Sequence, residues 1–307
     1  MHRRIGARTF DFSREVAVMA IINRTPNSFF DHGSTFRLDK AFTAAIAAVR
    51  DGADFVDLGG VPFGRGPAVG LEEEIDRVVP LVEAIHAASD ILISVDTFNA
   101  EVARLSIEAG ASVINDTSGL YDPDMAAVLA ASATTLVLAH SLGPPRSEPA
   151  CPRYDNVTAE VVAFLRDRVA RAVAAGVPLE RLIVDPGHDL NKNTYHSLEL
   201  TRRLEEIVAI GLPTLVAVSN KDFIGETLDR EQGKRLEGSL AAAVICIMKG
   251  ARIVRMHDVA AAVAATRMTE AVLGFRAPAY TRHNRGDHDG CDHRPGLAAP
   301  DSRDARR

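Results

Sequence analysis

Polar side chains that could hold a ligand follow a series of short apolar runs. Asp96 ends one such run, and Asn115, Asp185 and Lys221 follow three others. Carboxylates and an amide can accept hydrogen bonds from a flat heterocycle, while an ammonium group can donate to a ring carbonyl or ring nitrogen. If the four segments meet, these residues predict a pocket for a nitrogen-containing ring.

A second set of residues suits an anion. Arg255 and His257 can supply charged hydrogen-bond donors to phosphate oxygens, and Asn23 adds an amide. An acidic or hydroxyl residue after a strand is also an ordinary helix N-cap. We assign that structural role to Thr97, Asp116 and Asp258. The remaining residues predict a site for a heterocycle beside an anion.

Eight β-rich runs alternate with helical patterns along the chain. The runs cover residues 16–22, 55–58, 91–95, 112–114, 135–139, 182–184, 214–218 and 252–254. Helical periodicity covers residues 38–50, 71–87, 100–108, 124–131, 157–174, 197–210, 236–248 and 259–273. Strict β-then-α order predicts a parallel sheet, and eight units predict a closed (β/α)8 TIM barrel. In such a barrel the residues after the strands meet at one mouth.

Glycines mark the expected helix ends. Gly52, Gly110, Gly176 and Gly250 each fall between a helical pattern and the next run, where a left-handed residue commonly ends a helix. No GxGxxG segment is present, which disfavours an open dinucleotide-binding sheet.

Composition favours one large domain. The 307 residues are 47% hydrophobic, and we expect a lead-in at residues 1–15, a barrel at 16–279 and a disordered tail at 280–307. A net charge of −6 disfavours a general nucleic-acid binder, and no apolar run approaches the length of a membrane span. Three separated cysteines indicate neither disulfides nor zinc, so we expect a cytoplasmic protein.

Ordered motifs from about residue 16 to 275 resemble the dihydropteroate synthase family. They are MAIINRTPNSFFD at 19–31, DLGG at 57–60, SVDT at 94–97, IND at 114–116, DPG at 185–187, SNK at 219–221 and IVRMHDV at 253–259. The resemblance implies a homodimeric TIM barrel with Mg²⁺ that joins a dihydropterin methyl pyrophosphate to p-aminobenzoate and releases pyrophosphate.

The resemblance also implies roles for individual residues. Pterin would be held by the residues that match the family's ring contacts, which are Asp96, Asn115, Asp185 and Lys221, and Ser219 would also bind substrate. Arg255 would cover the ring and reach the pyrophosphate. Asn23 and His257 match contacts to metal and pyrophosphate. Lys221, Arg255 and Asp96 would form the catalytic set.

Four segments depart from the family pattern. VPFGRGP at 61–67 replaces a Ser-Thr-Arg-Pro-Gly type segment, so Arg65 is displaced by about one position. The first loop has Arg24 where the family favours a small apolar residue, and Asn27 where it favours aspartate. Asn220 replaces an arginine, and HDLNK at 188–192 replaces a Gly-Phe-Gly-Lys type run. All four surround the second-substrate side, whereas the pterin side is nearly unchanged.

Two functions follow from this division of the pocket. One is a synthase with a rebuilt and weakened p-aminobenzoate site, and the other is a pterin-binding paralogue without synthase activity, similar to divergent second copies in actinobacteria. A third alternative is a methyltetrahydrofolate-binding methyltransferase barrel with a corrinoid protein as partner. The loop at 25–29 and the segment 255–257 favour the synthase family over this third alternative.

Overall fold

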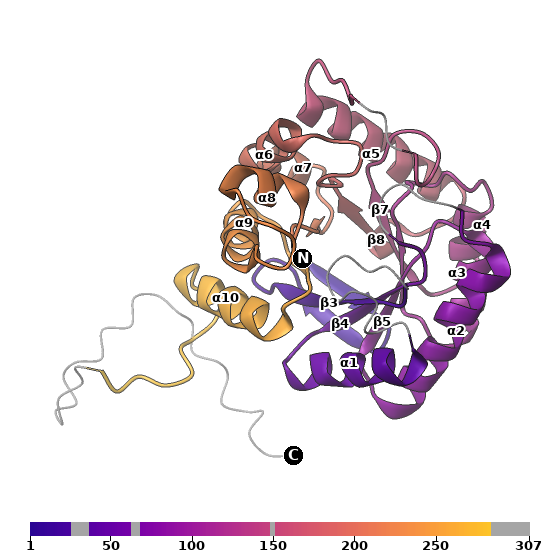
Figure 1. Ribbon diagram of the computed structural model, residues 1–307, viewed down its shortest axis with the longest axis horizontal. Helices are drawn as coiled ribbons and strands as arrows, with labels where there is room; N and C mark the ends of the chain where they lie inside the picture. Colours follow the sequence, from indigo (N-terminus) through magenta and orange to yellow (C-terminus); the bar gives the residue numbers. More distant parts are fainter. Residues whose placement is uncertain (26–36, 63–67, 148–150, 284–307) are drawn as a thin grey trace.

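Eight parallel strands form the centre of the molecule, with helices arranged around them (Figure 1). The computed structural model describes residues 1–25, 37–62, 68–147 and 151–283. In order, the barrel strands are β3 (Ala17–Asn23), β4 (Phe55–Gly59), β5 (Leu92–Asp96), β6 (Val113–Asp116), β7 (Thr135–Ala139), β8 (Leu182–Asp185), β9 (Leu215–Val216) and β10 (Ile253–Met256). A single bridge between Val184 and Thr214 brings β8 beside β9, so the sheet nearly closes into the predicted TIM barrel.

The helices follow the strands in the expected order. They are α1 (Leu38–Arg50), α2 (Leu71–Ala88), α3 (Ala100–Glu108), α4 (Met125–Ala130), α5 (Val157–Ala174), α6 (Thr194–Arg202), α7 (Leu204–Val208), α8 (Asp222–Leu228), α9 (Leu236–Met248) and α10 (Val259–Val272), with a short 3-10 helix at Leu179–Arg181. The four glycines predicted to end helices all have positive φ. The helix predicted at 197–210 is interrupted at Arg203, and α8 was not predicted.

Alternating residues of the strands face the interior of the barrel. Phe55 contributes to the inner apolar cluster, while its neighbours Val56 and Leu58 face the helices. Asp57 and Gly59 continue the inward series, and Gly59 pairs in register with Asp96 on β5. Because side chains alternate in a strand, the interior changes from apolar to polar toward the carboxyl ends.

The opposite end of the barrel is filled by the N-terminal segment. Strands β1 (His2–Ile5) and β2 (Arg8–Asp11) form an antiparallel hairpin whose buried residues join the inner apolar cluster. Phe10 stacks on Phe55 with ring centroids 5.3 Å apart. The lead-in expected at residues 1–15 therefore forms a floor beneath the inner apolar cluster.

Candidate active site at the barrel mouth

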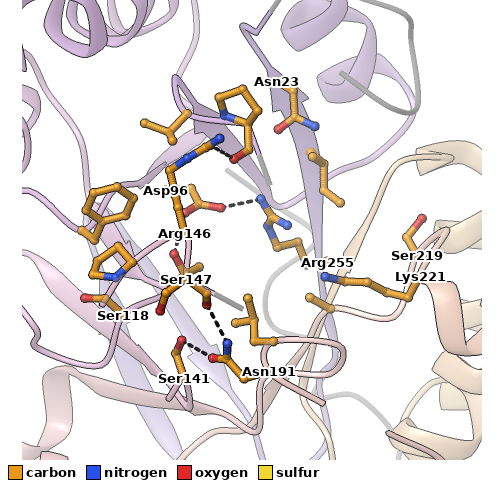
Figure 2. Close-up of a pocket in the computed structure, with 18 of the residues that line it drawn as sticks. Asn23, Asp96, Ser118, Ser141, Arg146, Ser147, Asn191, Ser219, Lys221 and Arg255 are labelled. Carbon is orange, nitrogen blue, oxygen red and sulfur yellow. Dashed lines mark hydrogen bonds and ion pairs between the residues drawn. The ribbon is translucent and has the colours of Figure 1, made fainter. Parts of the chain in front are cut away.

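A pocket lies at the carboxyl ends of the strands, where the sequence predicted a site (Figure 2). Six of the eight predicted site residues line it, namely Asn23, Asp96, Ser219, Lys221, Arg255 and His257. They come from β3, β5, β10 and the segments that follow β9 and β10. Residues far apart in the sequence thus converge on one cavity.

Arg255 lies across the centre of the mouth between two carboxylates. Its Nε donates to Asp57 Oδ2 at 2.6 Å, and its Nη2 donates to Asp96 Oδ2 at 2.9 Å. Burial disfavours the charge of Arg255, but Asp57 and Asp96 outweigh burial and raise its pKa. The guanidinium therefore stays charged and holds the two acidic side chains together.

The surroundings of Asp96 favour the neutral form of its carboxyl group. Burial raises its pKa to about 7, and the charge of Asp57 adds to the rise, while Arg255 opposes both. Thr117 also donates a hydrogen bond to Asp96 Oδ1 at 3.3 Å. A carboxyl group whose pKa lies near neutrality can accept or donate hydrogen bonds to a heterocycle.

The other two predicted site residues, Asn115 in β6 and Asp185 at the end of β8, do not line the pocket themselves. Asn115 Nδ2 donates to Asp57 Oδ2 at 3.3 Å, and its buried Oδ1 has no hydrogen-bond partner among the described residues. Asp185 accepts from the amide of Gly187 at 2.7 Å. Burial raises the pKa of Asp185, and the charges of Lys221 and Arg255 oppose that rise. An unsatisfied buried acceptor is costly, so Asn115 Oδ1 suits a ligand donor.

Lys221 and His257 come from neighbouring segments of the mouth. Burial lowers the pKa of Lys221, although Asp189, Asp185 and Asp96 favour its charged form. Ser219 Oγ lies 2.9 Å from His257 Nδ1 and accepts from the His257 amide at 3.2 Å. Ser219 therefore fixes the orientation of His257 within the pocket wall.

Asp57 is a site residue that the sequence analysis did not single out. It is fully buried, and it accepts hydrogen bonds from Ser94, Asn115 and Arg255. Its position inside a predicted strand concealed it, because we sought functional residues after each run. An acidic residue within an otherwise apolar strand was the available signal.

Two of the four altered segments line the pocket, through Val61 and Pro62 and through Leu190 and Asn191, whereas Arg24 and Asn220 do not. Arg146 Nη1 donates to the carbonyl of Pro62, which joins the loop after β7 to the loop after β4. Asn191 Oδ1 accepts from Ser141 Oγ at 2.8 Å and from the Leu142 amide at 2.7 Å. Asn191 has a φ of 52°, a left-handed conformation that Asn tolerates. Side-chain hydrogen bonds thus connect these loops.

The loop arginine Arg24 has a structural role. Its Nη1 donates to the carbonyls of Asp76 and Arg77 in α2, each at 2.8 Å. Pro80 lies inside α2 and has no amide hydrogen for the carbonyl four residues earlier, which is that of Asp76. Arg24 therefore compensates for a proline rather than altering the pocket. Asn27 and Arg65 lie outside the described residues.

Two of the three predicted N-caps, Thr97 and Asp116, do not cap a helix, whereas Asp258 occupies the N-cap position of α10. Asp116 accepts from Ser118 and from the Leu120 amide, and Thr97 donates to Glu74 at 2.6 Å. Asn99 caps α3 in place of Thr97, and Asp258 makes no side-chain cap bond. These residues shape the loops at the mouth of the barrel.

Asn23 contributes a side-chain amide oxygen to the pocket wall. An added Cβ on Gly59 would lie 3.2 Å from Asn23 Oδ1, so the glycine leaves room for this amide. The described residues contain no group of three His, Cys, Asp or Glu side chains placed to hold a metal. Mg²⁺ commonly binds through one or two protein oxygens together with substrate phosphates, and Asn23 fits only a shared site of that kind.

Comparison with known proteins identifies the family. The model for pterin binding enzymes matches residues 19–257, which is most of the barrel. The chain belongs to the dihydropteroate synthase family. It is 46% identical over 270 residues to "Inactive dihydropteroate synthase 2" of Mycobacterium leprae, covering 86% of this chain and 93% of that protein. It is 42% identical over 260 residues to dihydropteroate synthase of Escherichia coli K12, covering 84% and 92% of the two chains.

A solved structure of the family has the same fold. The Yersinia pestis dihydropteroate synthase in a sulfonamide drug complex superimposes with a TM-score of 0.86 at 38% identity. The match covers 90% of this chain and all of the Yersinia chain. The TIM barrel predicted from the alternating runs is confirmed. Among the described residues, no helix is long and apolar enough to span a membrane.

Proposed function

We propose that the protein binds 7,8-dihydropterin-6-ylmethyl pyrophosphate at the barrel mouth and joins it slowly to p-aminobenzoate with release of pyrophosphate. The observation that carries this proposal is the convergence of Asp96, Lys221 and Arg255 on one pocket beside Asn115 and Asp185. Asp96 and Asp185 would accept from the pterin ring nitrogens. Lys221 would donate to the ring carbonyl or a ring nitrogen.

In this reaction the bond between the methylene carbon and the pyrophosphate oxygen breaks first. Positive charge then develops on the pterin, and the buried carboxylates of Asp96, Asp185 and Asp57 would stabilise it. The aniline nitrogen forms the new carbon–nitrogen bond and loses a proton. Arg255 and His257 would hold the departing pyrophosphate through charged hydrogen bonds.

We propose Asn23 as a ligand of Mg²⁺ that arrives with the pyrophosphate. The ion would neutralise charge on the leaving group. Asn23, as a neutral ligand, would bind it weakly without that group. The reaction belongs to the cytoplasm, where free cysteines such as Cys151 remain reduced.

A homodimer is the proposed assembly. Four large apolar side chains are exposed on the adjacent helices α9 and α10, namely Ile245, Met248, Met268 and Val272, with exposed fractions from 45% to 69%. A contiguous exposed apolar surface commonly marks a protein interface. These two helices provide such a surface away from the barrel mouth.

A pterin-binding protein without synthase activity is the second candidate. The relative from Mycobacterium leprae is described as inactive, and the departures of this chain that line the pocket, at 61–62 and 190–191, fall in the segments expected to hold p-aminobenzoate. Leu190 occupies the position where the family has an aromatic residue, so an aromatic surface that could pack against the aniline ring is missing. The pterin residues are the same under both proposals.

One preparation of the wild-type protein separates the two candidates. Pyrophosphate release should be measured with dihydropterin pyrophosphate and p-aminobenzoate, with and without Mg²⁺, and light scattering should report the assembly. The proposal predicts Mg²⁺-dependent release of pyrophosphate that requires p-aminobenzoate and is slower than release by the Escherichia coli enzyme. It also predicts that the protein is a dimer. Pterin binding without any release would establish the second candidate, and a monomer would exclude the proposed interface.

A further inference from the structure

Asp189 lies in the loop between β8 and α6, where the family pattern has glycine. Its φ is 63°, a left-handed conformation that an aspartate tolerates at a cost. Both carboxylate oxygens are bound: Oδ1 accepts from Ser197 Oγ at 2.7 Å, and Oδ2 accepts from the Phe223 amide at 3.2 Å. The Asp189 amide also donates to Ser197 Oγ at 3.1 Å. The side chain therefore has one fixed orientation.

The bond to Phe223 connects Asp189 to the start of helix α8. That helix begins directly after Lys221, whose own side chain makes no capping hydrogen bond to the helix. The first amides of a helix have no partner within the helix, and an acidic oxygen commonly satisfies one of them. Asp189 supplies this oxygen from the loop between β8 and α6. It therefore anchors the start of α8, which Lys221 directly precedes.

Asp189 also interacts electrostatically with Lys221. Of the three carboxylates that favour the charged form of Lys221, Asp189 acts most strongly, ahead of Asp185 and Asp96. Burial and the neighbouring Arg255 act in the opposite direction.

Two further basic groups lie near this pair. Lys192 is buried, and its charge is favoured by Asp185 and Asp189 and opposed by Lys221. Burial lowers the pKa of His188 to about 3, so the imidazole is neutral at physiological pH. Asp189 is thus one of two carboxylates shared between two buried ammonium groups.

We propose that Asp189 is a positioning residue for Lys221: its carboxylate anchors the start of α8 through the Phe223 amide and places an opposing charge near Lys221, so that Lys221 faces the pterin ring. This proposal rests on the proposed function, in which Lys221 donates to the pterin. Asp189 does not line the pocket and acts through Lys221.

The test uses lysine side chains labelled with ¹³C at Cε in the ligand-free, full-length protein. NMR titration of Lys221, assigned with Lys221→Met, should be compared between wild type and Asp189→Asn. Asparagine tolerates the left-handed conformation and keeps an acceptor for Phe223 but removes the charge. The proposal predicts that the Lys221 midpoint falls by about one pH unit or more, because an opposing charge is lost.

The matched control is Asp222→Asn. Asp222 adjoins Lys221 in sequence, but its carboxylate is 68% exposed and pairs with Arg235. Its replacement should leave the Lys221 midpoint unchanged. Asp189→Gly gives a second variant that relieves the backbone conformation, and it should lower the midpoint as Asp189→Asn does.

Binding of dihydropterin pyrophosphate to the same proteins gives the functional readout. In Asp189→Asn the affinity for this ligand should be about tenfold lower than in the wild type at pH 8. As the pH rises, the affinity of the variant should begin to fall at a lower pH than that of the wild type. An unchanged Lys221 midpoint in both Asp189 variants would overturn the proposal. Failure of the wild type to bind this ligand would instead overturn the proposed function, because the NMR shift needs no ligand.

Discussion

At the scale of single residues, Asp57 joins side chains from three other strands at the barrel mouth. It accepts from Arg255, Asn115 and Ser94 with no exposure to solvent. Removal of one partner from a buried ion pair leaves an uncompensated charge, which is strongly destabilising. Asp57 thus contributes to folding as well as to the charge of the site.

Replacing Asp57 with asparagine should lower the free energy of unfolding by about 3 kcal/mol, since Arg255 would keep only Asp96 as a partner. Urea denaturation at pH 7 measures the change. Asp167→Asn is the matched control, because that carboxylate is 60% exposed and its pair with Arg168 contributes little. Equal stability of Asp57→Asn and wild type would contradict the role of Asp57.

Residue types were easier to predict from the sequence than their strand positions. Asp96, Asn115 and Asp185 were expected after their strands, but each belongs to its strand. The apolar pattern stops where inward positions become polar, although the backbone ladder continues. Sequence periodicity therefore reports the apolar part of a strand and misses its functional end.

At the scale of elements, Lys192 fixes the loop after β8. Its Nζ lies 2.8 Å from His140 Nδ1 and donates to the carbonyls of Gly187 and Leu190 at 2.9 and 2.8 Å. Burial lowers the pKa of Lys192 to about 7, and Asp185 and Asp189 oppose this effect. Hydrogen bonds from this buried group to two carbonyls of the loop and to His140 stabilise the loop after β8.

Lys192→Met should destabilise the protein by roughly 2–3 kcal/mol, because two carbonyls would lose their donor in a buried place. Thermal unfolding measures the loss, and hydrogen exchange should show it concentrated at residues 187–192. Lys234→Met serves as the control, since Lys234 is 71% exposed. Unaltered exchange in the β8 loop would show that Lys192 does not hold it.

Short elements escaped prediction for a physical reason. Helix α8 has seven residues, too few for an apolar periodicity to distinguish it from a loop. The break at Arg203 has no glycine or proline to mark it. By contrast, α1, α3, α5 and α9 begin and end where predicted, since longer helices repeat their apolar pattern over several turns.

At the scale of the whole molecule, the barrel has one closed and one open end. The N-terminal hairpin fills the floor with Phe10 and Phe12, which stack with ring centroids 5.2 Å apart. This hairpin was not predicted, because two strands of four residues carry little pattern. The tail expected to be disordered lies mostly outside the described residues, which end at 283.

The closed floor leaves the carboxyl-end pocket as the place where the interior polar residues meet solvent. By the family resemblance, the chain keeps the residues expected to hold a pterin, while its segments at 61–67 and 188–192 differ from the family pattern. Pterin binding is therefore the claim on which both proposed functions depend.

Calorimetric titration with dihydropterin pyrophosphate tests this claim most directly, using wild type, Asp96→Ala, Asp185→Ala and the control Asp258→Ala. We expect binding to wild type and to the control, with at least a tenfold weaker affinity in each of the other two variants, because ring donors would lose buried acceptors. Equal affinity in all four proteins, or no binding to the wild type, would contradict it.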